Sequence, residues 1–462
     1  NRGFHHINFS NPNLLWAASG LSPSRLRFGG SGNDNLVYGL SSGSPQCANI
    51  TPAPPPEQPG CDYVTPGCLN ATHWNHLYEF AKASGTEFLF GVAFGLADAC
   101  EQGPAYTWDP SNAAMLLSYL ESNQQSIWGF ELGNEVNNNG GSPCNLQPQQ
   151  QAKAFQTFAP MVRSKLPSAK LVGPDTGGRD PEPWLTALLP LVANVSLHAV
   201  THHVYAGISR RNFDSASQLD NDAAEIEWYT SLVQRLAPHS EIWAGEDGPI
   251  GGGDSGTCGS DSACGTYATT LWYADDLARR ATHGFVQYQR QDLIGGWYGL
   301  VNTVDSEQSL GPLDPVILRP DYWVNYLWKR TIGTAVYNLT SPNPSLRAYA
   351  FSGPPPSPYS PHECTIAPLQ LVLINLNTTS AVDVELGDVD VHSHGVVSLW
   401  TLTPGDGPYG LVTNLNGHPL ETVVNSTETM PSFLREIPVN ATTLPATHKL
   451  SIPPLSTTFV CY

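Results

Sequence analysis

The sequence predicts an α/β fold, a (β/α)8 barrel of the TIM type, followed by a smaller antiparallel β-sandwich. Over the first two-thirds of the 462 residues, short apolar runs alternate with amphipathic helical stretches. Beyond about residue 334, short strand-like runs separated by turns replace the helical pattern. Strands that alternate with helices pair in parallel, and this many repeats favour a closed barrel over an open sheet. We therefore expect the barrel in residues 1–334 and the sandwich in residues 335–462.

The barrel pattern contains seven strand-like runs. In chain order they are residues 25–28, 87–94, 127–132, 170–172, 197–204, 241–244 and 284–288. The helix-like segments are residues 72–84, 111–122, 149–166, 183–192, 220–236, 267–283 and 320–333, with Ser111 and Asp220 as expected N-caps. An eighth strand is needed to close the barrel, because an open edge leaves backbone groups unpaired. Residues 4–9 offer only a short candidate, so we expect the first strand upstream of Asn1.

The remaining third of the chain is predicted to be all-β. Its expected strands are residues 345–351, 369–376, 382–386, 396–402 and 456–461. Short strands divided by turns, without helical periodicity, are typical of a small antiparallel sandwich packed on a larger domain.

Composition restricts the partners and the compartment. The chain has 21 Lys plus Arg against 40 Asp plus Glu, a net charge of −19, which disfavours nucleic acid as a ligand. We find no apolar run long enough to span a bilayer. Eight Asn-x-Ser/Thr sequons and nine cysteines indicate an N-glycosylated protein that is secreted or held in an acidic lysosome- or vacuole-like compartment. We expect a monomer, which a separate N-terminal segment could complete.

The cysteines allow two local assignments. Cys258 and Cys264 bracket a short polar loop, and Cys364 and Cys461 bracket the last hundred residues, so each pair could form a disulfide. The other five, Cys47, Cys61, Cys68, Cys100 and Cys144, are an odd set.

The strongest chemical signal is an Asn-Glu pair at the end of a strand, Asn134-Glu135. Barrel enzymes keep their active sites at the carboxyl ends of the strands. In barrel glycosidases such a Glu protonates the glycosidic oxygen, and the Asn before it can bind the sugar 2-hydroxyl. A polar strand end without function is the alternative.

A second strand ends in Gly245-Glu246-Asp247. With one strand before residue 25, Glu135 closes strand four and Glu246 closes strand seven, so the two carboxyls can face each other across the barrel mouth. A separation of about 5–5.5 Å is expected for a retaining glycosidase. Asp247 competes with Glu246 as nucleophile, but alternation along a strand turns its side chain the other way.

Five motifs in order resemble those of glycoside hydrolase family 79, which contains heparanase and β-glucuronidases. They are residues 26–30 (LRFGG), 130–135 (FELGNE), 200–205 (VTHHVY), 245–246 with the glycine run 251–253, and 290–302 (RQDLIGGWYGLVN). The last motif resembles plant- and microbial-type members more than mammalian heparanase.

The resemblance implies a role for each matching residue. Glu135 would be the acid/base and Glu246 the nucleophile. The implied substrate-binding residues are Asn134 for the 2-hydroxyl, Tyr205 beside the nucleophile with His203 next to it, Tyr298 and the backbone of Gly251 and Gly252 for the uronate carboxylate, and Gln291 and Ser31 in the same subsite. No cofactor is expected. His202, His203 and the pair His5-His6 lack further ligands at suitable spacing, so no metal site is expected either.

These observations predict a retaining exo-β-glucuronidase that releases terminal glucuronic acid, or its 4-O-methyl form, from glycans or glucuronides. Three alternatives stay open: an endo-acting, heparanase-like enzyme, a carbohydrate-binding protein on an inactive scaffold, and a glycosidase of a neighbouring family such as a xylosidase or arabinofuranosidase. The acidic composition favours exo action, because a cleft for polysulfated chains needs basic residues.

Overall fold

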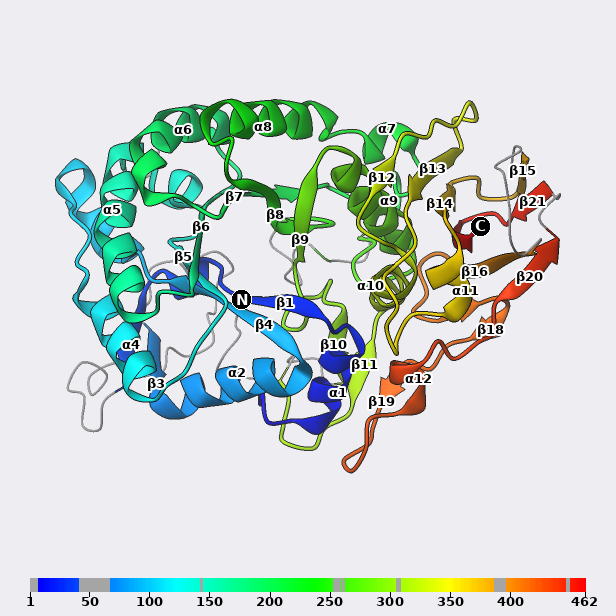
Figure 1. The fold of residues 1–462 in the computed structure, drawn as a ribbon, viewed down its shortest axis with the longest axis horizontal. Helices are drawn as coiled ribbons and strands as arrows, with labels where there is room; N and C mark the ends of the chain where they lie inside the picture. The colour runs from blue at the N-terminus through cyan, green and yellow to red at the C-terminus, as the bar shows by residue number, and fades with distance from the viewer. Residues whose placement is uncertain are drawn as a thin grey trace.

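The computed structural model describes residues 7–40, 67–141, 144–251, 258, 262–304, 309–385, 396–445 and 449–462. Figure 1 shows a barrel ringed by helices, with an antiparallel β-region beside it formed by the last third of the chain. The predicted fold class is confirmed. The boundary near residue 334 stays a prediction.

A parallel sheet of seven strands forms the barrel, in the spatial order β1-β4-β5-β6-β7-β8-β9. The strands are β1 (Ser24–Phe28), β4 (Thr86–Val92), β5 (Gly129–Leu132), β6 (Lys170–Thr176), β7 (Ala199–Tyr205), β8 (Glu241–Gly248) and β9 (Phe285–Arg290). All seven predicted strands are confirmed. The sheet leaves β1 and β9 as edges, and Arg25 bridges them by donating to Oε1 of Gln287 at 2.9 Å. An upstream eighth strand stays a prediction.

Helices surround the sheet, as Figure 1 shows for α5, α6 and α8. Their bounds are α1 (Pro12–Gly20), α2 (Ala71–Ser84), α3 (Leu96–Gln102), α4 (Ser111–Ser122), α5 (Pro148–Lys165), α6 (Pro181–Leu188), α7 (Ala216–Leu219), α8 (Ala223–Leu236), α9 (Ala268–Thr282) and α10 (Pro320–Thr331). Two short strands, β2 (Leu36–Gly39) and β3 (Gly67–Asn70), pair outside the barrel. No helix in the described ranges has both the length and the apolar character needed to cross a bilayer.

Both predicted N-caps were wrong. Helix α4 begins at Ser111 itself, and the Asp109 side chain accepts bonds from the Ser111 backbone N–H and hydroxyl, at 2.9 and 2.8 Å. Asp220 ends α7, and its carboxylate instead pairs with Arg347 at 2.7 Å. The carboxylate expected to cap a helix therefore binds an arginine 127 residues away in the sequence. Local sequence does not show such a contact.

The C-terminal region is built on an antiparallel sheet. Its strands are β12 (Val336–Tyr337), β13 (Leu346–Phe351), β14 (Gln370–Asn375), β22 (Ser456–Cys461), β16 (Val396–Pro404), β17 (Thr413–Leu415), β18 (His418–Pro419) and β20 (Thr442–Pro445). A second sheet pairs β15 (Val382–Glu385) with β21 (Lys449–Ile452), and a third joins β10 (Val301–Thr303), β11 (Val316–Leu318) and β19 (Val423–Val424). Two short helices, α11 (His362–Ile366) and α12 (Ser432–Arg435), complete this region.

Strand β14 shows how this region attaches to the barrel. Val372 and Ile374 point into the large core that includes the barrel helices, whereas Leu371 and Leu373 point into a separate core with residues of β21. Alternation along one strand thus supplies two apolar layers. The predicted sandwich is held to the barrel by a continuous core.

Three disulfides lie within the described residues. Cys258–Cys264 and Cys364–Cys461 confirm the two pairs suggested by the sequence, and Cys100–Cys144 adds a third. Seven sequon asparagines are described, and each is partly or fully exposed; Asn49 lies outside the described residues. The disulfides are compatible with an extracellular or lysosomal protein.

Candidate active site

The carboxyl ends of the barrel strands bring the predicted residues together at one mouth. Alternation along β7 turns His203 and Tyr205 inward, while His202 faces outward and binds Glu225 of α8 at 2.8 Å. On β8 the same alternation turns Glu246 inward. Asp247 lies on the opposite side, fully buried and 2.7 Å from Arg280 of α9, where burial raises its pKa to about 8.

Glu135 and Glu246 face each other across this mouth. One carboxylate oxygen of each lies within 4.8 Å of the other and of a ring nitrogen of His203. This spacing is far shorter than the separation of about 6.5–9.5 Å in inverting glycosidases and fits the separation of about 5–5.5 Å in retaining ones.

Two donors hold Glu246. The Tyr205 hydroxyl donates to Oε1, and Nη1 of Arg27 donates to Oε2 at 2.7 Å. Burial by itself would raise the pKa of Glu246, but the charges of His203 and Arg27 lower it below its usual value. A carboxylate kept ionised and fixed at both oxygens has the properties of a nucleophile.

Glu135 is held differently, by a strained backbone and two side chains. Its φ of 47° lies in the left-handed region, and its N–H donates to the carbonyl of Asp175 at 2.7 Å. Its Oε1 lies 3.0 Å from Nδ1 of His203, and its Oε2 accepts from Asn138 at 2.9 Å. Gly177 packs against the carboxylate, and a Cβ there would lie 2.4 Å from Oε1.

Asn134 and Ser31 lie beside the same centre. The Asn134 N–H donates to both carboxylate oxygens of Asp34, at 3.0 and 3.1 Å, and its Nδ2 donates to the Ser31 hydroxyl at 3.2 Å. Its Oδ1 accepts from Arg27 at 2.8 Å. The amide is therefore fixed from both ends.

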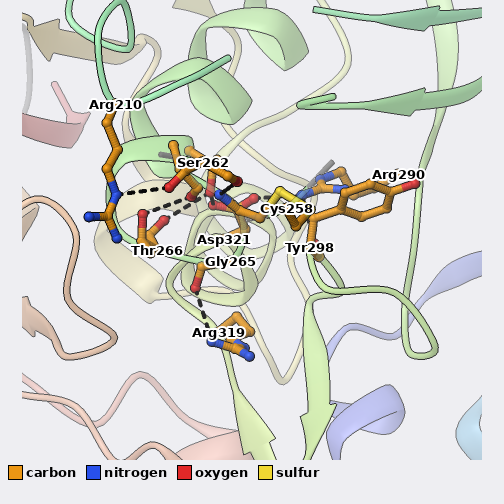
Figure 2. The surroundings of a disulfide bond; sticks show 12 residues. Arg210, Cys258, Ser262, Gly265, Thr266, Arg290, Tyr298, Arg319 and Asp321 are labelled. Atoms are coloured by element: carbon orange, nitrogen blue, oxygen red, sulfur yellow. Dashed lines mark hydrogen bonds and ion pairs between the residues drawn. A yellow bond between two sulfur atoms is a disulfide. The ribbon is translucent and has the colours of Figure 1, made fainter. Parts of the chain in front are cut away.

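Tyr298 reaches the site from the loop after β9. It is buried, its hydroxyl is hydrogen-bonded to that of Tyr205, and burial raises its pKa. Its backbone carbonyl accepts from Arg290 at 3.0 Å, and Arg290 pairs with Asp321 of α10 at 2.7 Å. Figure 2 shows Arg290 and Tyr298 close to Cys258 of the Cys258–Cys264 disulfide.

The other predicted residues are only partly brought together. Gly251 lies against the Tyr205 ring: a Cβ added to the glycine would be 3.9 Å from Cγ of Tyr205. The N–H of Gln291 donates to the carbonyl of Asp247 at 2.9 Å. Gly252 lies outside the described residues.

The sequence reasoning missed several polar residues of this centre, Asp34 among them. Arg27, Asp175 and Asn138 were not assigned roles, although each contacts a predicted residue, and Glu131 contacts Arg27. Arg27 and Glu131 could have been found as charged residues inside apolar strands, and Asp175 as an acid at a strand end. Burial raises the pKa of Glu131 to about 8, although it accepts from Nε of Arg27 at 2.6 Å.

Glu135, His203 and Glu246 are also the group whose ligand atoms could converge on a cation in the described part of the chain. Both ring nitrogens of His203 face carboxylates, however, and hydrogen bonds to Asp175 and Glu135 raise its pKa to about 10 despite burial. A protonated imidazole has no lone pair for a metal. The trio therefore fits an ion-paired histidine better than a metal site.

A barrel with a facing pair of carboxylates at its mouth is typical of glycoside hydrolases. The family model of glycosyl hydrolase family 79, N-terminal domain, matches residues 2–278. The chain belongs to this family.

Several curated proteins are similar to this chain in sequence. "Heparanase-like protein 1" of Arabidopsis thaliana is 27% identical over 75% of this chain and 62% of its own length. "Heparanase" of Mus musculus is 28% identical over 96% of this chain and 84% of its own. "Baicalin-beta-D-glucuronidase" of Scutellaria baicalensis is 25% identical over 72% and 64%. The chain thus spans about three-fifths of the length of the plant heparanase-like proteins.

Solved structures support the fold alone. A family 51 α-L-arabinofuranosidase from Bifidobacterium longum superposes with a TM-score of 0.61 at 14% identity, covering 99% of this chain and 92% of its own. The bifunctional glucanase-xylanase CelM2, from a metagenome library, gives 0.60 at 13%, covering 99% and 96%.

Proposed function

We propose that this glycoside hydrolase is a retaining exo-β-glucuronidase, with Glu246 as nucleophile and Glu135 as acid/base. The observation that carries the proposal is the separation of at most 4.8 Å between one oxygen of each carboxylate. Family membership and the relative named for baicalin β-D-glucuronide support the substrate class.

Two displacements make up the reaction. In the first, Glu246 attacks the anomeric carbon, the glycosidic bond breaks, and Glu135 gives its proton to the leaving oxygen. In the second, Glu135 takes a proton from water, which attacks the anomeric carbon and releases Glu246. Asn134, fixed by Asp34 and Arg27, would hold the sugar 2-hydroxyl during both steps.

A carboxylate on the sugar would meet neutral donors. Tyr298 would bind it through its hydroxyl, with the backbone of Gly251 and Gly252 alongside and Gln291 and Ser31 lining the subsite. Hydroxyl and backbone N–H groups can bind an anion without an arginine. Tyr298→Phe should lower kcat/KM for a glucuronide by about 10- to 100-fold, the value of one hydrogen bond to a charged group, and leave residual activity on the matching glucoside unchanged. Tyr229→Phe, another buried tyrosine, is the control.

Exo action is supported by the charges around the site. Two arginines at the site are neutralised, since Arg27 pairs with Glu246 and Arg290 pairs with Asp321. The net charge of −19 opposes the approach of a polysulfated chain. Endo action stays the alternative because several relatives are named heparanase. Faster turnover of a simple aryl β-glucuronide than of heparan sulfate would support exo action, and internal chain cleavage would overturn it.

Azide rescue tests the assignment of the two carboxylates. Glu246→Gln and Glu135→Ala should each lower turnover by at least about a thousandfold. Azide should rescue Glu135→Ala and give a glycosyl azide of retained configuration. Glu87→Gln, an exposed change on β4, should leave activity unchanged. An azide product of inverted configuration would contradict the mechanism.

A further inference from the structure

Asp175 lies at the end of β6 and is fully buried inside the barrel. Its φ of 55° is in the left-handed region, which is costly for an aspartate and is maintained only where the surroundings fix it. Its N–H donates to the Thr201 hydroxyl at 2.9 Å, and its carbonyl accepts from the N–H of Glu135 at 2.7 Å. The backbone of Asp175 thus holds the backbone of the proposed acid/base.

The side chain of Asp175 reaches Glu135 through His203. Its Oδ1 lies 3.3 Å from Nε2 of His203, whose Nδ1 lies 3.0 Å from Oε1 of Glu135. An imidazole that donates from both nitrogens carries a positive charge. The other titratable groups whose charges act on this ring include Glu246 on β8, Arg27 on β1 and Glu131 on β5.

We propose that Asp175 is a positioning residue that holds a permanent positive charge on His203, and that this cation stabilises the carboxylate of Glu135 as it forms. The proposal rests on the proposed function. During glycosylation a bond forms between Glu246 and the anomeric carbon, the bond to the leaving oxygen breaks, and the proton of Glu135 moves to that oxygen. Negative charge therefore disappears from Glu246 and appears on Glu135.

A fixed cation lies beside each of the two carboxylates whose charge changes in this step. Arg27 lies 2.7 Å from Glu246, and His203 lies 3.0 Å from Glu135. With Asp175 ionised, the cations Arg27 and His203 are balanced before the step by the carboxylates of Glu246 and Asp175. After the step they are balanced by the carboxylates of Glu135 and Asp175. The charges of Arg27 and His203 lower the pKa of Asp175 despite its burial, which keeps it ionised. A preorganised charge of this kind lowers the barrier because nothing must reorient during the reaction.

Leaving-group dependence separates this role from simple packing. In Asp175→Asn, His203 loses its counter-ion, so proton donation by Glu135 becomes harder. Donation matters only when the leaving group needs a proton. We expect kcat/KM to fall about 100-fold for an alkyl β-glucuronide and less than about threefold for a glucuronide of a strongly acidic nitrophenol.

Asp247→Asn is the matched control, because Asp247 is equally buried but pairs with Arg280. It should change kcat/KM of both substrates by the same factor. An equal loss on both substrates in Asp175→Asn would overturn the proposal. Glu135→Ala must itself show the leaving-group dependence; its failure to do so would instead overturn the proposed function.

Nitrogen NMR of ring-labelled histidine tests the charge without any turnover. The His203 signals, assigned by comparison with His203→Gln, should show both ring nitrogens protonated at about pH 7 in the unsubstituted protein. In Asp175→Asn the ring should lose its proton at lower pH. A neutral His203 ring at about pH 7 in the unsubstituted protein would contradict the proposal even where the variants fold poorly.

Discussion

Arg27 of β1 donates from Nη1 to Oε2 of Glu246 on β8, at 2.7 Å. The same guanidinium donates from Nε to Glu131 at 2.6 Å and from Nη2 to Asn134 at 2.8 Å. Its side chain is only 6% exposed, so one enclosed cation fixes three acceptors: one on β5, one just after β5 and one on β8. A guanidinium presents its donors in a rigid plane and so fixes the directions of its acceptors, whereas an ammonium is a compact charge with rotatable donors.

Replacing Arg27 should therefore damage both stability and activity. Arg27→Met leaves buried carboxylates without a counter-charge, and we expect a loss of about 3–5 kcal/mol in the free energy of unfolding. We also expect kcat/KM to fall at least about 100-fold, because Glu246 is no longer oriented. Urea unfolding and steady-state kinetics measure the two effects. The control is Lys165→Met, which breaks an exposed pair with Glu121; it should cost less than about 1 kcal/mol and leave activity unchanged. Unimpaired kinetics in Arg27→Met would contradict the role of Arg27.

Gly177 gives a second test, because it leaves space for the acid/base. A Cβ at this position would lie 2.4 Å from Oε1 and 2.6 Å from Cδ of Glu135. Since the obstructed atoms belong to the end of a side chain, Gly177→Ala should fold normally and displace the carboxylate. A misplacement of about 1 Å costs about 100-fold in rate.

Gly141→Ala is the control for this substitution. Gly141 belongs to the segment that follows Glu135, but among the described residues its added Cβ would meet nothing nearer than Trp184, at 3.6 Å. We expect kcat/KM and the melting temperature to stay unchanged. Equal activity of Gly177→Ala and Gly141→Ala would show that Glu135 tolerates displacement.

The sequence predicted the seven barrel strands and the facing glutamates because both depend on local pattern. Apolar runs mark the strands, and Glu135 and Glu246 each follow one. Arg27 and Asp175 were missed because their partners lie more than a hundred residues away or on another strand. Only barrel closure brings these charges together, and no periodicity encodes that.

The loop after β9 that carries Tyr298 also depends on contacts that the sequence pattern does not show. Its motif predicted that Tyr298 belongs to the subsite, yet the support from Arg290 and Asp321 depends on how α10 packs. Thr269 of α9 also donates to Asp321, at 2.9 Å. The backbone position of Tyr298 therefore depends on contacts that join β9, α9 and α10.

Loss of the two disulfides predicted from the sequence should differ in its effects on KM and on melting temperature. Cys258–Cys264 closes a separation of six residues next to Tyr298, whereas Cys364–Cys461 closes 97 residues within the C-terminal region. Loop-closure entropy predicts a cost of about 2 kcal/mol for losing the first and about 4–5 kcal/mol for losing the second. We expect Cys258→Ser/Cys264→Ser to raise KM for a glucuronide several-fold with a modest drop in melting temperature.

Cys364→Ser/Cys461→Ser should show the reverse pattern, a larger drop in melting temperature with KM unchanged in the remaining folded protein. Calorimetry and steady-state kinetics on the two double variants give the comparison. The relation between the disulfide loop and the subsite would be contradicted if KM changed only in the variant without Cys364–Cys461.

Stability should fall as the pH rises, because two buried acids keep their protons in the folded protein. Burial raises the pKa of Glu131 and of Asp247 to about 8, whereas carboxyls in the unfolded chain ionise near pH 4. Between about pH 4 and 8 the folded state therefore binds more protons than the unfolded state, and the free energy of unfolding decreases with pH. His203 acts in the same direction, since its folded pKa of about 10 exceeds the unfolded value of about 6.5 and its contribution is lost as the pH rises through 10.

Melting temperatures measured from about pH 5 to 9 should therefore decline steadily. Asp247→Asn cannot ionise, so it should flatten the decline, most clearly between about pH 5 and 8. Asp180→Asn, at an exposed position, should leave the slope unchanged. A melting temperature that rises toward pH 8 would contradict the protonated state of Glu131 and Asp247. It would also contradict the charge balance proposed above, in which Glu246 and Asp175 alone neutralise Arg27 and His203.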